Sequence, residues 1–188
     1  MEEFDSHTEH AQEQAHEAAH HAREGWVMGV ALTAAILAAL AAVTSLLSGH
    51  HEHEAMVDQI GASDQWNYYQ AKGIKAAILE QRIENQQLAG EKPHPQQVAK
   101  QKEYKKQQEE ISAKANEMQN SSKLHDRIHI TLAGGVTLFQ VAIAVAAISA
   151  LTRKRIFWFV GIGLGLAAVV FLARGLMTWS LAMSQHAG

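Results

Sequence analysis

The sequence predicts an all-α protein that crosses a membrane three times and carries a long antiparallel, coiled-coil-like helical hairpin outside it. Three observations predict this fold class. Three apolar runs are long enough to span a bilayer, a polar segment rich in helix-forming residues separates the first two runs, and both prolines of the chain fall together in that segment. The 188 residues suit one domain, the net charge of −3 argues against nucleic acid as a partner, and the absence of cysteine excludes disulfides and thiolate metal sites.

The apolar runs cover residues 25–48, 130–151 and 156–183. A hydrocarbon core about 30 Å thick is crossed by roughly 20 helical residues, and each backbone amide in lipid must bond within its own helix. Three buried helices of a soluble core are the alternative, but soluble helices keep a polar face that these runs lack. Residues 1–24 are polar and acidic, so we interpret the first run as a permanent anchor and not as a cleaved signal peptide.

Basic residues near the runs predict the orientation. The short connection 152–155 holds three of them, and short, positively charged loops stay in the cytoplasm. We therefore expect residues 1–24 and 152–155 on the cytoplasmic side, and residues 49–129 with the tail 184–188 on the periplasmic side. The tryptophans expected at the membrane interfaces are Trp26 and Trp158 on one side and Trp179 on the other.

The polar residues 49–129 predict two helices that turn back at residues 90–95. Both prolines lie in this turn, and proline removes a helix donor and disfavours helix in the residue before it. The expected arms, 52–90 and 95–128, would extend roughly 50–60 Å at 1.5 Å per residue. We assign the seam between them to Ile60, Ala71, Ile74 and Ile78 of the first arm and to Tyr104, Ile111, Ala115 and Met118 of the second, with Gln97, Gln101, Gln108 and Ser122 as polar members.

Few large apolar residues occupy that seam, and helices gain most of their stability from packing. We therefore expect the arms to pack against copies of themselves in a homo-oligomer, with a loosely solvated hairpin as the alternative. Small residues in the apolar runs also allow close helix contacts, either within one chain or between chains. They are Gly161 and Gly165 in the third run, Ala31, Ala35, Ala38, Ala39 and Ala42 in the first, and Ala142, Ala146 and Ala150 in the second.

Two polar side chains inside the apolar runs are candidate functional residues. Gln140 lies at the centre of the second run, where its amide needs a partner and either joins subunits or lines a pore. Arg174 lies toward the far end of the third run, from which a long side chain reaches the interface.

An aromatic and polar block follows the first apolar run at residues 63–75, with the sequence SDQWNYYQAKGIK. This block resembles the signature of a bacterial membrane family, domain of unknown function 4337, and the order of polar and apolar segments is also similar. Asn67 and Gly73 stand where the family pattern suggests Ala and Ser. The resemblance implies a multi-pass protein of the bacterial inner membrane, and it supplies no activity and no catalytic residues.

Within this block, aromatic rings with polar tips suit a helix–helix contact. We interpret Asp64, Trp66, Tyr68, Tyr69 and Lys72 as an interaction patch. Packing within the chain is the main alternative, and a small-molecule site is a more distant one.

Histidines form two clusters that are candidate metal ligands. His16 and His20 share the H-E-x-x-H spacing of zinc peptidases, but the tail lacks an apolar face that would bury a catalytic zinc. His50 and His53 follow the first apolar run and form a second weak candidate. Solvated histidines are the simpler interpretation of both clusters, so we expect no cofactor.

The sequence therefore favours a non-enzymatic scaffold of the inner membrane, homo-oligomeric through its hairpins. Its expected partners are the lipid bilayer, copies of itself and an unidentified protein. An oligomeric pore that contains Gln140, and divalent metal binding by histidines, remain the alternative hypotheses.

Overall fold

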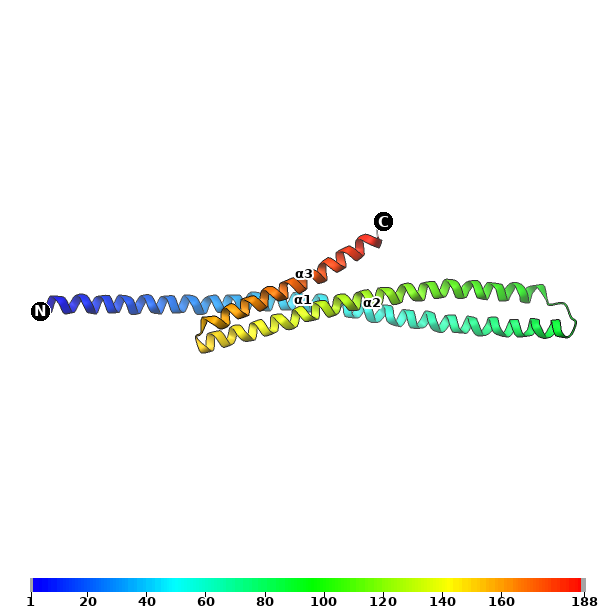
Figure 1. The fold of residues 1–188 in the computed structure, drawn as a ribbon, viewed down its shortest axis with the longest axis horizontal. Helices are drawn as coiled ribbons and strands as arrows, with labels where there is room; N and C mark the ends of the chain where they lie inside the picture. The colour runs from blue at the N-terminus through cyan, green and yellow to red at the C-terminus, as the bar shows by residue number, and fades with distance from the viewer. Residues whose placement is uncertain (1, 187–188) are drawn as a thin grey trace. The chain divides into compact units, whose positions relative to one another are not determined.

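Long helices form nearly all of the chain in a computed structural model, which describes the backbone of residues 2–186 and the side chains of residues 25–184. The helices within this described part are α1 (Glu2–Leu88), α2 (Pro95–Thr152) and α3 (Arg155–His186) (Figure 1). Each is built mainly from Ala, Leu, Glu, Gln and Lys, the residues with the highest helix propensity, or from apolar runs. The all-α prediction is confirmed.

The turn between α1 and α2 ends one helix and starts the next with recognisable caps. Gly90 has a φ of 77°, and the amides of Gly90 and Glu91 donate to the carbonyls of Gln87 and Gln86 at 3.0 and 2.8 Å. This pair of bonds is the Schellman motif, in which a glycine adopts the left-handed conformation after the last helical turn. Pro95 then opens α2 at a position where a helix needs no amide donor.

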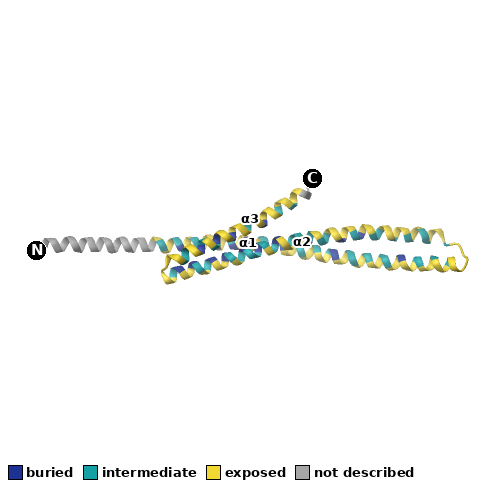
Figure 2. Cartoon of the chain, in the orientation of Figure 1, coloured by how far each residue is buried: buried dark blue, intermediate teal, exposed yellow. Residues whose placement is uncertain are grey.

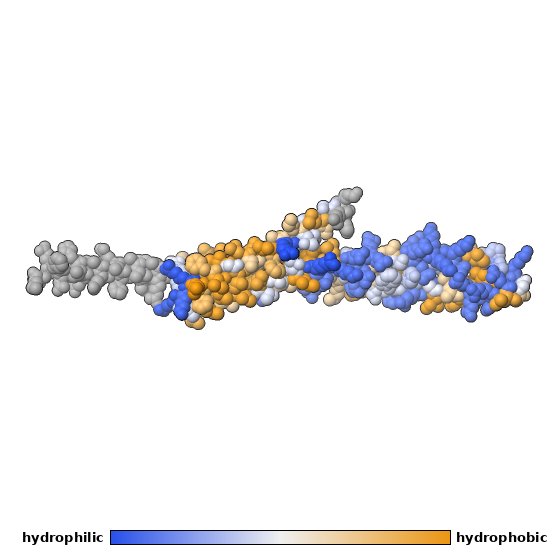
Figure 3. Space-filling model, viewed as in Figure 1, coloured by the Kyte–Doolittle hydropathy of each residue, from blue (hydrophilic) through white to orange (hydrophobic). Residues whose placement is uncertain are grey.

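The chain divides into two compact units. The apolar unit contains Met1–Ser48 and Ile130–Gly188, and the polar unit contains Gly49–His129. In the described residues, three helices contain stretches long and apolar enough to cross a membrane, Gly25–Leu88, Pro95–Thr152 and Arg155–Ser184. Hydrophobic atoms cover most of the visible apolar unit, and hydrophilic atoms predominate over the polar unit (Figure 3). These properties are compatible with a multi-pass membrane protein.

Small residues set the helix contacts inside the apolar unit. Its core gathers Leu37 and Ala41 of α1, Phe139 and Ala142 of α2, and Ala168 of α3. A methyl group added at Gly161 would lie 3.2 Å from the carbonyl oxygen of Ala142, so even a small side chain there would press against the backbone of α2. A Cβ at Gly165 would lie 2.6 Å from a terminal methyl of Leu37, and one at Gly175 would lie 2.5 Å from a terminal methyl of Leu132, both on side chains that can move. Close approach of this kind is how small residues stabilise helix contacts in lipid.

The alanines of the first two apolar runs differ in where they face. Ala142 and Ala146 of α2 are buried inside the unit. Five alanines of α1 are exposed, and the α1 face that contacts the other helices carries Val30, Leu37, Ala41 and Thr44 instead (Figure 2). The exposed alanines are Ala31, Ala35, Ala38, Ala39 and Ala42. Packing within the chain therefore uses Ala142, Ala146 and glycines of α3 such as Gly161, and it leaves these five alanines of α1 on the surface.

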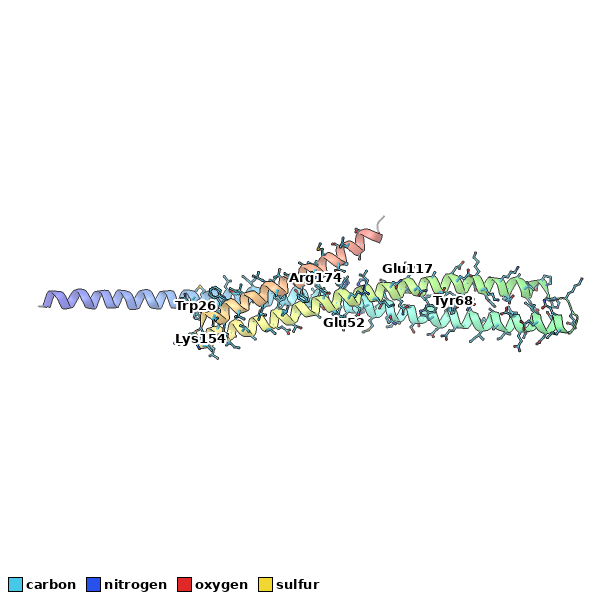
Figure 4. All side chains as sticks on the ribbon, viewed as in Figure 1. Trp26, Glu52, Tyr68, Glu117, Lys154 and Arg174 are labelled. Carbon is cyan, nitrogen blue, oxygen red and sulfur yellow. The ribbon has the colours of Figure 1, made fainter. Side chains whose placement is uncertain are left out.

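Aromatic and basic side chains meet at the end of the apolar unit that contains the α2–α3 turn (Figure 4). The indole nitrogen of Trp158 donates to the Thr33 hydroxyl at 3.2 Å. The Arg155 guanidinium lies 5.9 Å from the ring of Trp26, a cation–π contact. Two tryptophans and a cation at one end are what a membrane interface favours.

In the polar unit, residues of α1 and α2 pair in antiparallel order. The Ser122 hydroxyl donates to the Ala55 carbonyl at 2.8 Å, and the Gln108 amide donates to the Tyr69 carbonyl at 3.3 Å. Burial recurs at steps of three and four along both helices (Figure 2). The inner positions are His51, Ala55, Asp58, Ala62, Gln65, Tyr69, Lys72, Ala76, Leu79, Ile83 and Gln86 on α1, and Gln97, Gln101, Tyr104, Gln108, Ile111, Ala115, Met118, Ser122 and His125 on α2.

The seam predicted for the second arm is confirmed, but that predicted for the first arm is wrong. Ile60, Ile74 and Ile78 are 57%, 62% and 49% exposed, and Ala71 is exposed as well. Size contributes to the difference, because part of the inner face of α1 consists of small residues, Ala55, Ala62 and Ala76. A Cβ at Gly61 would lie 2.5 Å from the terminal methyl of Met118. Ile60, Ile74 and Ile78 therefore lie on the outer face of α1, whereas Leu79 and Ile83 lie on its inner face.

Candidate functional site

The aromatic block at residues 63–75 is partly built into the contact between α1 and α2. Trp66 and Tyr69 meet edge to face, with ring centroids 5.5 Å apart. The Lys72 ammonium lies 5.0 Å from the ring centroids of both Tyr68 and Tyr104. Lys72 therefore joins an aromatic ring of its own helix to one of the opposite helix, as a cation–π contact does.

Two members of the predicted interaction patch, Tyr68 and Asp64, lie on the exposed side of α1. Tyr68 is half exposed and Asp64 is exposed, and Figure 4 shows Tyr68 on α1. Trp66, Tyr69 and Lys72 are half-buried. One side of the block therefore packs within the chain and the other side faces outward, and its role as an interaction patch stays a prediction.

A histidine pair closes the polar unit at the end opposite its turn. His51 is 2% exposed, and its Nδ1 lies 2.9 Å from Nδ1 of His125. One of these nitrogens must donate and the other must accept, so the bond requires at least one imidazole to be neutral. The Ser122 bond to Ala55 lies one helical turn away, and together the two bonds join α1 to α2 here.

Burial lowers the pKa of His51 from its ordinary value of 6.5. The nearby charges of His125, His50 and His129 lower the pKa further, and Glu54 raises it. Both causes disfavour the imidazolium form, because a buried cation loses hydration and like charges repel. The arrangement therefore favours a neutral His51, and protonation of both imidazoles would break the bond.

The histidines predicted as metal ligands differ from those that the structure brings together. His50 and His53 are exposed, and the ring of His50 lies 5.5 Å from that of His51 between centroids, tilted by 56°. His16 and His20 lie outside the residues whose side chains the structure describes. Among residues 25–184, no group of three or more His, Cys, Asp or Glu side chains gathers as a metal site would require.

The two candidate functional residues of the apolar runs, Gln140 and Arg174, lie on the surface of the apolar unit. Gln140 is exposed, and its amide makes no hydrogen bond with any other side chain or backbone group of the described residues. Thr137, one turn earlier, donates its hydroxyl to the Ala133 carbonyl at 3.0 Å. Arg174 is exposed on α3 (Figure 4). Gln140 is thus a polar group at the centre of an apolar face.

Sequence reasoning missed the pair His51 and His125. Neither residue belongs to a recognisable motif, and 73 residues separate them in the chain. One signal was present: folding the sequence about its prolines brings the histidines after the first apolar run close to those before the second. The exact partners depend on the stagger between the helices, which composition and spacing leave open.

These features define an all-α protein with three apolar stretches of membrane-spanning length and a polar antiparallel helix pair. Over residues 26–178 the chain matches the family described as a domain of unknown function, DUF4337, and it belongs to that family. The resemblance carried by residues 63–75 is therefore confirmed. No curated protein and no solved structure matches the chain.

Proposed function

We propose that this protein is a non-enzymatic scaffold of the bacterial inner membrane that assembles from several copies of the chain. Its three apolar helices cross the bilayer, with the N-terminus and the Arg153–Arg155 turn in the cytoplasm. The polar unit stands in the periplasm as a coiled-coil hairpin and presents a surface for association. The three basic residues of that turn support this orientation.

The observation that carries this proposal is the unpartnered amide of Gln140. It lies at the centre of the second apolar stretch and is exposed on the surface of the apolar unit. In hydrocarbon, a polar group without a hydrogen bond costs several kcal/mol. A glutamine side chain both donates and accepts, so Gln140 of one copy and Gln140 of another satisfy each other across a symmetry axis.

The surfaces beside Gln140 support a contact between copies. Ala144 and Ala147 are exposed on the same helix, and the exposed alanines of α1 form a second small-residue surface. Small side chains let helices from different chains approach closely in lipid. Because the core of the apolar unit uses a different set of small residues, these surfaces are free to contact other copies.

Light scattering of the purified full-length protein in nanodiscs or detergent tests the proposal. The wild type should form a discrete multimer. Gln140→Leu should weaken association about 5- to 30-fold, since hydrogen bonds between membrane helices contribute about 1–2 kcal/mol. Thr137→Val is the matched control, because the Thr137 hydroxyl is already bonded within its own helix. A wild type that remains monomeric at all concentrations would overturn the proposal.

An oligomeric pore is the second candidate function, favoured by the same amide. If several copies surrounded an axis with Gln140 facing it, their amides would line a polar path through an otherwise apolar barrier. Conductance in planar bilayers that Gln140→Leu changes would favour the pore. If the wild type is multimeric but produces no conductance, the pore is refuted and only the scaffold proposal remains.

A further inference from the structure

The outer face of α1 in the polar unit carries a row of exposed aliphatic side chains. We define the outer stripe as Val57, Ile60, Asp64, Asn67, Ala71, Ile74 and Ile78. Val57 is 49% exposed, and the three isoleucines are exposed to a similar or greater degree. Four large aliphatic residues on a water-facing surface require an explanation, because scattered exposure is ordinary but an aligned row is not.

The spacing of the outer stripe is that of a helix–helix seam. Its members follow each other at steps of three and four residues, which keeps them on one side of a helix that packs against a parallel neighbour. The inner positions that contact α2, such as Ala55, Ala62 and Ala76, lie on a different side of the same helix. Helix α1 therefore has two seams, and α2 fills only one of them.

The equivalent outer face of α2 has a different character. It carries Glu103, Lys106, Glu110, Ala113, Glu117 and Asn120, all exposed. This is the charged, solvated face expected of a helix with no second partner. The aliphatic row is therefore a specific property of α1 and not a general feature of the polar unit.

We propose that the outer stripe of α1 packs against the outer stripe of α1 in a second copy of this chain, parallel and in register. This proposal rests on the self-association proposed above and names the surface that carries it. Copies inserted in one membrane share one orientation, so equivalent helices that meet around an axis normal to the membrane run parallel. Ile60, Ile74 and Ile78 then each meet their own counterpart.

The polar members of the outer stripe fit this occupant. In a parallel, in-register pair, Asp64 and Asn67 occupy successive layers, and each Asp64 faces the Asp64 of the other copy. The Asn67 amide of each copy can donate to these carboxylates and offset their repulsion. Polar layers in an apolar seam fix register and number of strands at some cost in stability, and here that cost includes the repulsion between the two carboxylates. The same layers would be unfavourable against a purely apolar partner, since the carboxylate would lose its hydration without a donor.

The charges beside the outer stripe also agree with this arrangement. One flank carries Lys75 and Arg82, and the other carries Gln70, Ala77 and Glu84. In a parallel pair the basic flank of one copy lies against the neutral and acidic flank of the other. No like charges are therefore forced together along the flanks.

Cysteine crosslinking in native membranes tests the proposal directly, because the chain contains no cysteine. Ile74→Cys and Ile78→Cys should each form a disulfide-linked dimer on mild oxidation, since a parallel, in-register seam brings identical positions together. Ala113→Cys, an exposed residue on the outer face of α2, is the matched control and should remain monomeric. Crosslinking of Ala113→Cys as strong as that of Ile74→Cys would overturn the proposal.

A second measurement separates this proposal from the one on which it rests. Ile74→Glu combined with Ile78→Glu should weaken association at least 10-fold while helix content stays unchanged, and Ala113→Glu should have no effect. A wild-type multimer without crosslinks at positions 74 and 78 would refute this surface and leave the scaffold standing. A wild-type monomer would refute both.

Discussion

Gly161 and Gly163 lie two residues apart on α3 and provide a matched test of the packing inside the apolar unit. A Cβ at Gly161 would lie 3.2 Å from the Ala142 carbonyl oxygen and 3.5 Å from the Ala146 amide nitrogen, whereas a Cβ at Gly163 would meet nothing within 4 Å. The obstacles at Gly161 are backbone atoms of α2. They can move only if the two helices separate.

The difference between Gly161→Ala and Gly163→Ala follows from these contacts. Replacing glycine by alanine inside a helix gains up to about 1 kcal/mol of helix propensity, and this gain is common to both variants. Overpacking a close contact typically costs about 1–3 kcal/mol, and only Gly161→Ala meets it. We therefore expect the free energy of unfolding of Gly163→Ala to exceed that of Gly161→Ala by about 1–3 kcal/mol.

Unfolding of the purified protein in mixed micelles, by titration with a denaturing detergent, measures this difference. Tryptophan fluorescence and far-ultraviolet circular dichroism report tertiary and helical structure separately. Leucine at the same two positions should widen the gap, because a larger side chain meets the same backbone. Equal stability of the two alanine variants would refute the close contact between α2 and α3.

Three further predictions concern the polar unit, each measured by hydrogen exchange of the full-length protein. The pKa of His51 is lowered in the fold. The contribution of His51 to stability is therefore complete above about pH 6.5 and decreases as the pH falls through the folded pKa. His51→Phe should reduce this pH dependence of stability, and an unchanged pH profile would contradict the prediction. Ser122→Ala removes the buried bond to the Ala55 carbonyl and should destabilise this end of the unit by about 1 kcal/mol, so unchanged protection near Ala55 would argue against that bond. Lys105→Ala removes a 3.0 Å ion pair with Glu80, whose side chains are 53% and 47% exposed. The free energy of unfolding should fall by no more than about 0.5 kcal/mol, as for exposed ion pairs in general, and a much larger loss would contradict this expectation.

The helices and the turn between α1 and α2 could be predicted because local chemistry decides them. Long uncharged runs must be helical if they are in lipid, and Gly90 with the following prolines ends one helix and starts the next through local bonds. The seam on α2 could also be predicted, because the outer face of α2 is charged and only one face remains that can pack against α1. Each of these features depends on neighbours in the chain.

The seam on α1 and the histidine pair could not be predicted in the same way. Helix α1 has two candidate faces, and the larger aliphatic residues, such as Ile74, indicated the wrong one. The true inner face is chosen by fit, since Gly61 admits the end of Met118. Fit and stagger between two helices depend on residues far apart in sequence, and so does the pairing of His51 with His125.

The connection between α2 and α3 constrains how these two helices can move relative to each other. Only Arg153 and Lys154 separate the two helices, and Arg153 adopts a left-handed φ of 57°. The Ser149 hydroxyl and the Phe157 amide both donate to the Lys154 carbonyl, at 3.1 and 3.3 Å. A link of two residues with these bonds holds the end of α2 beside the start of α3, so neither helix end can move far without the other.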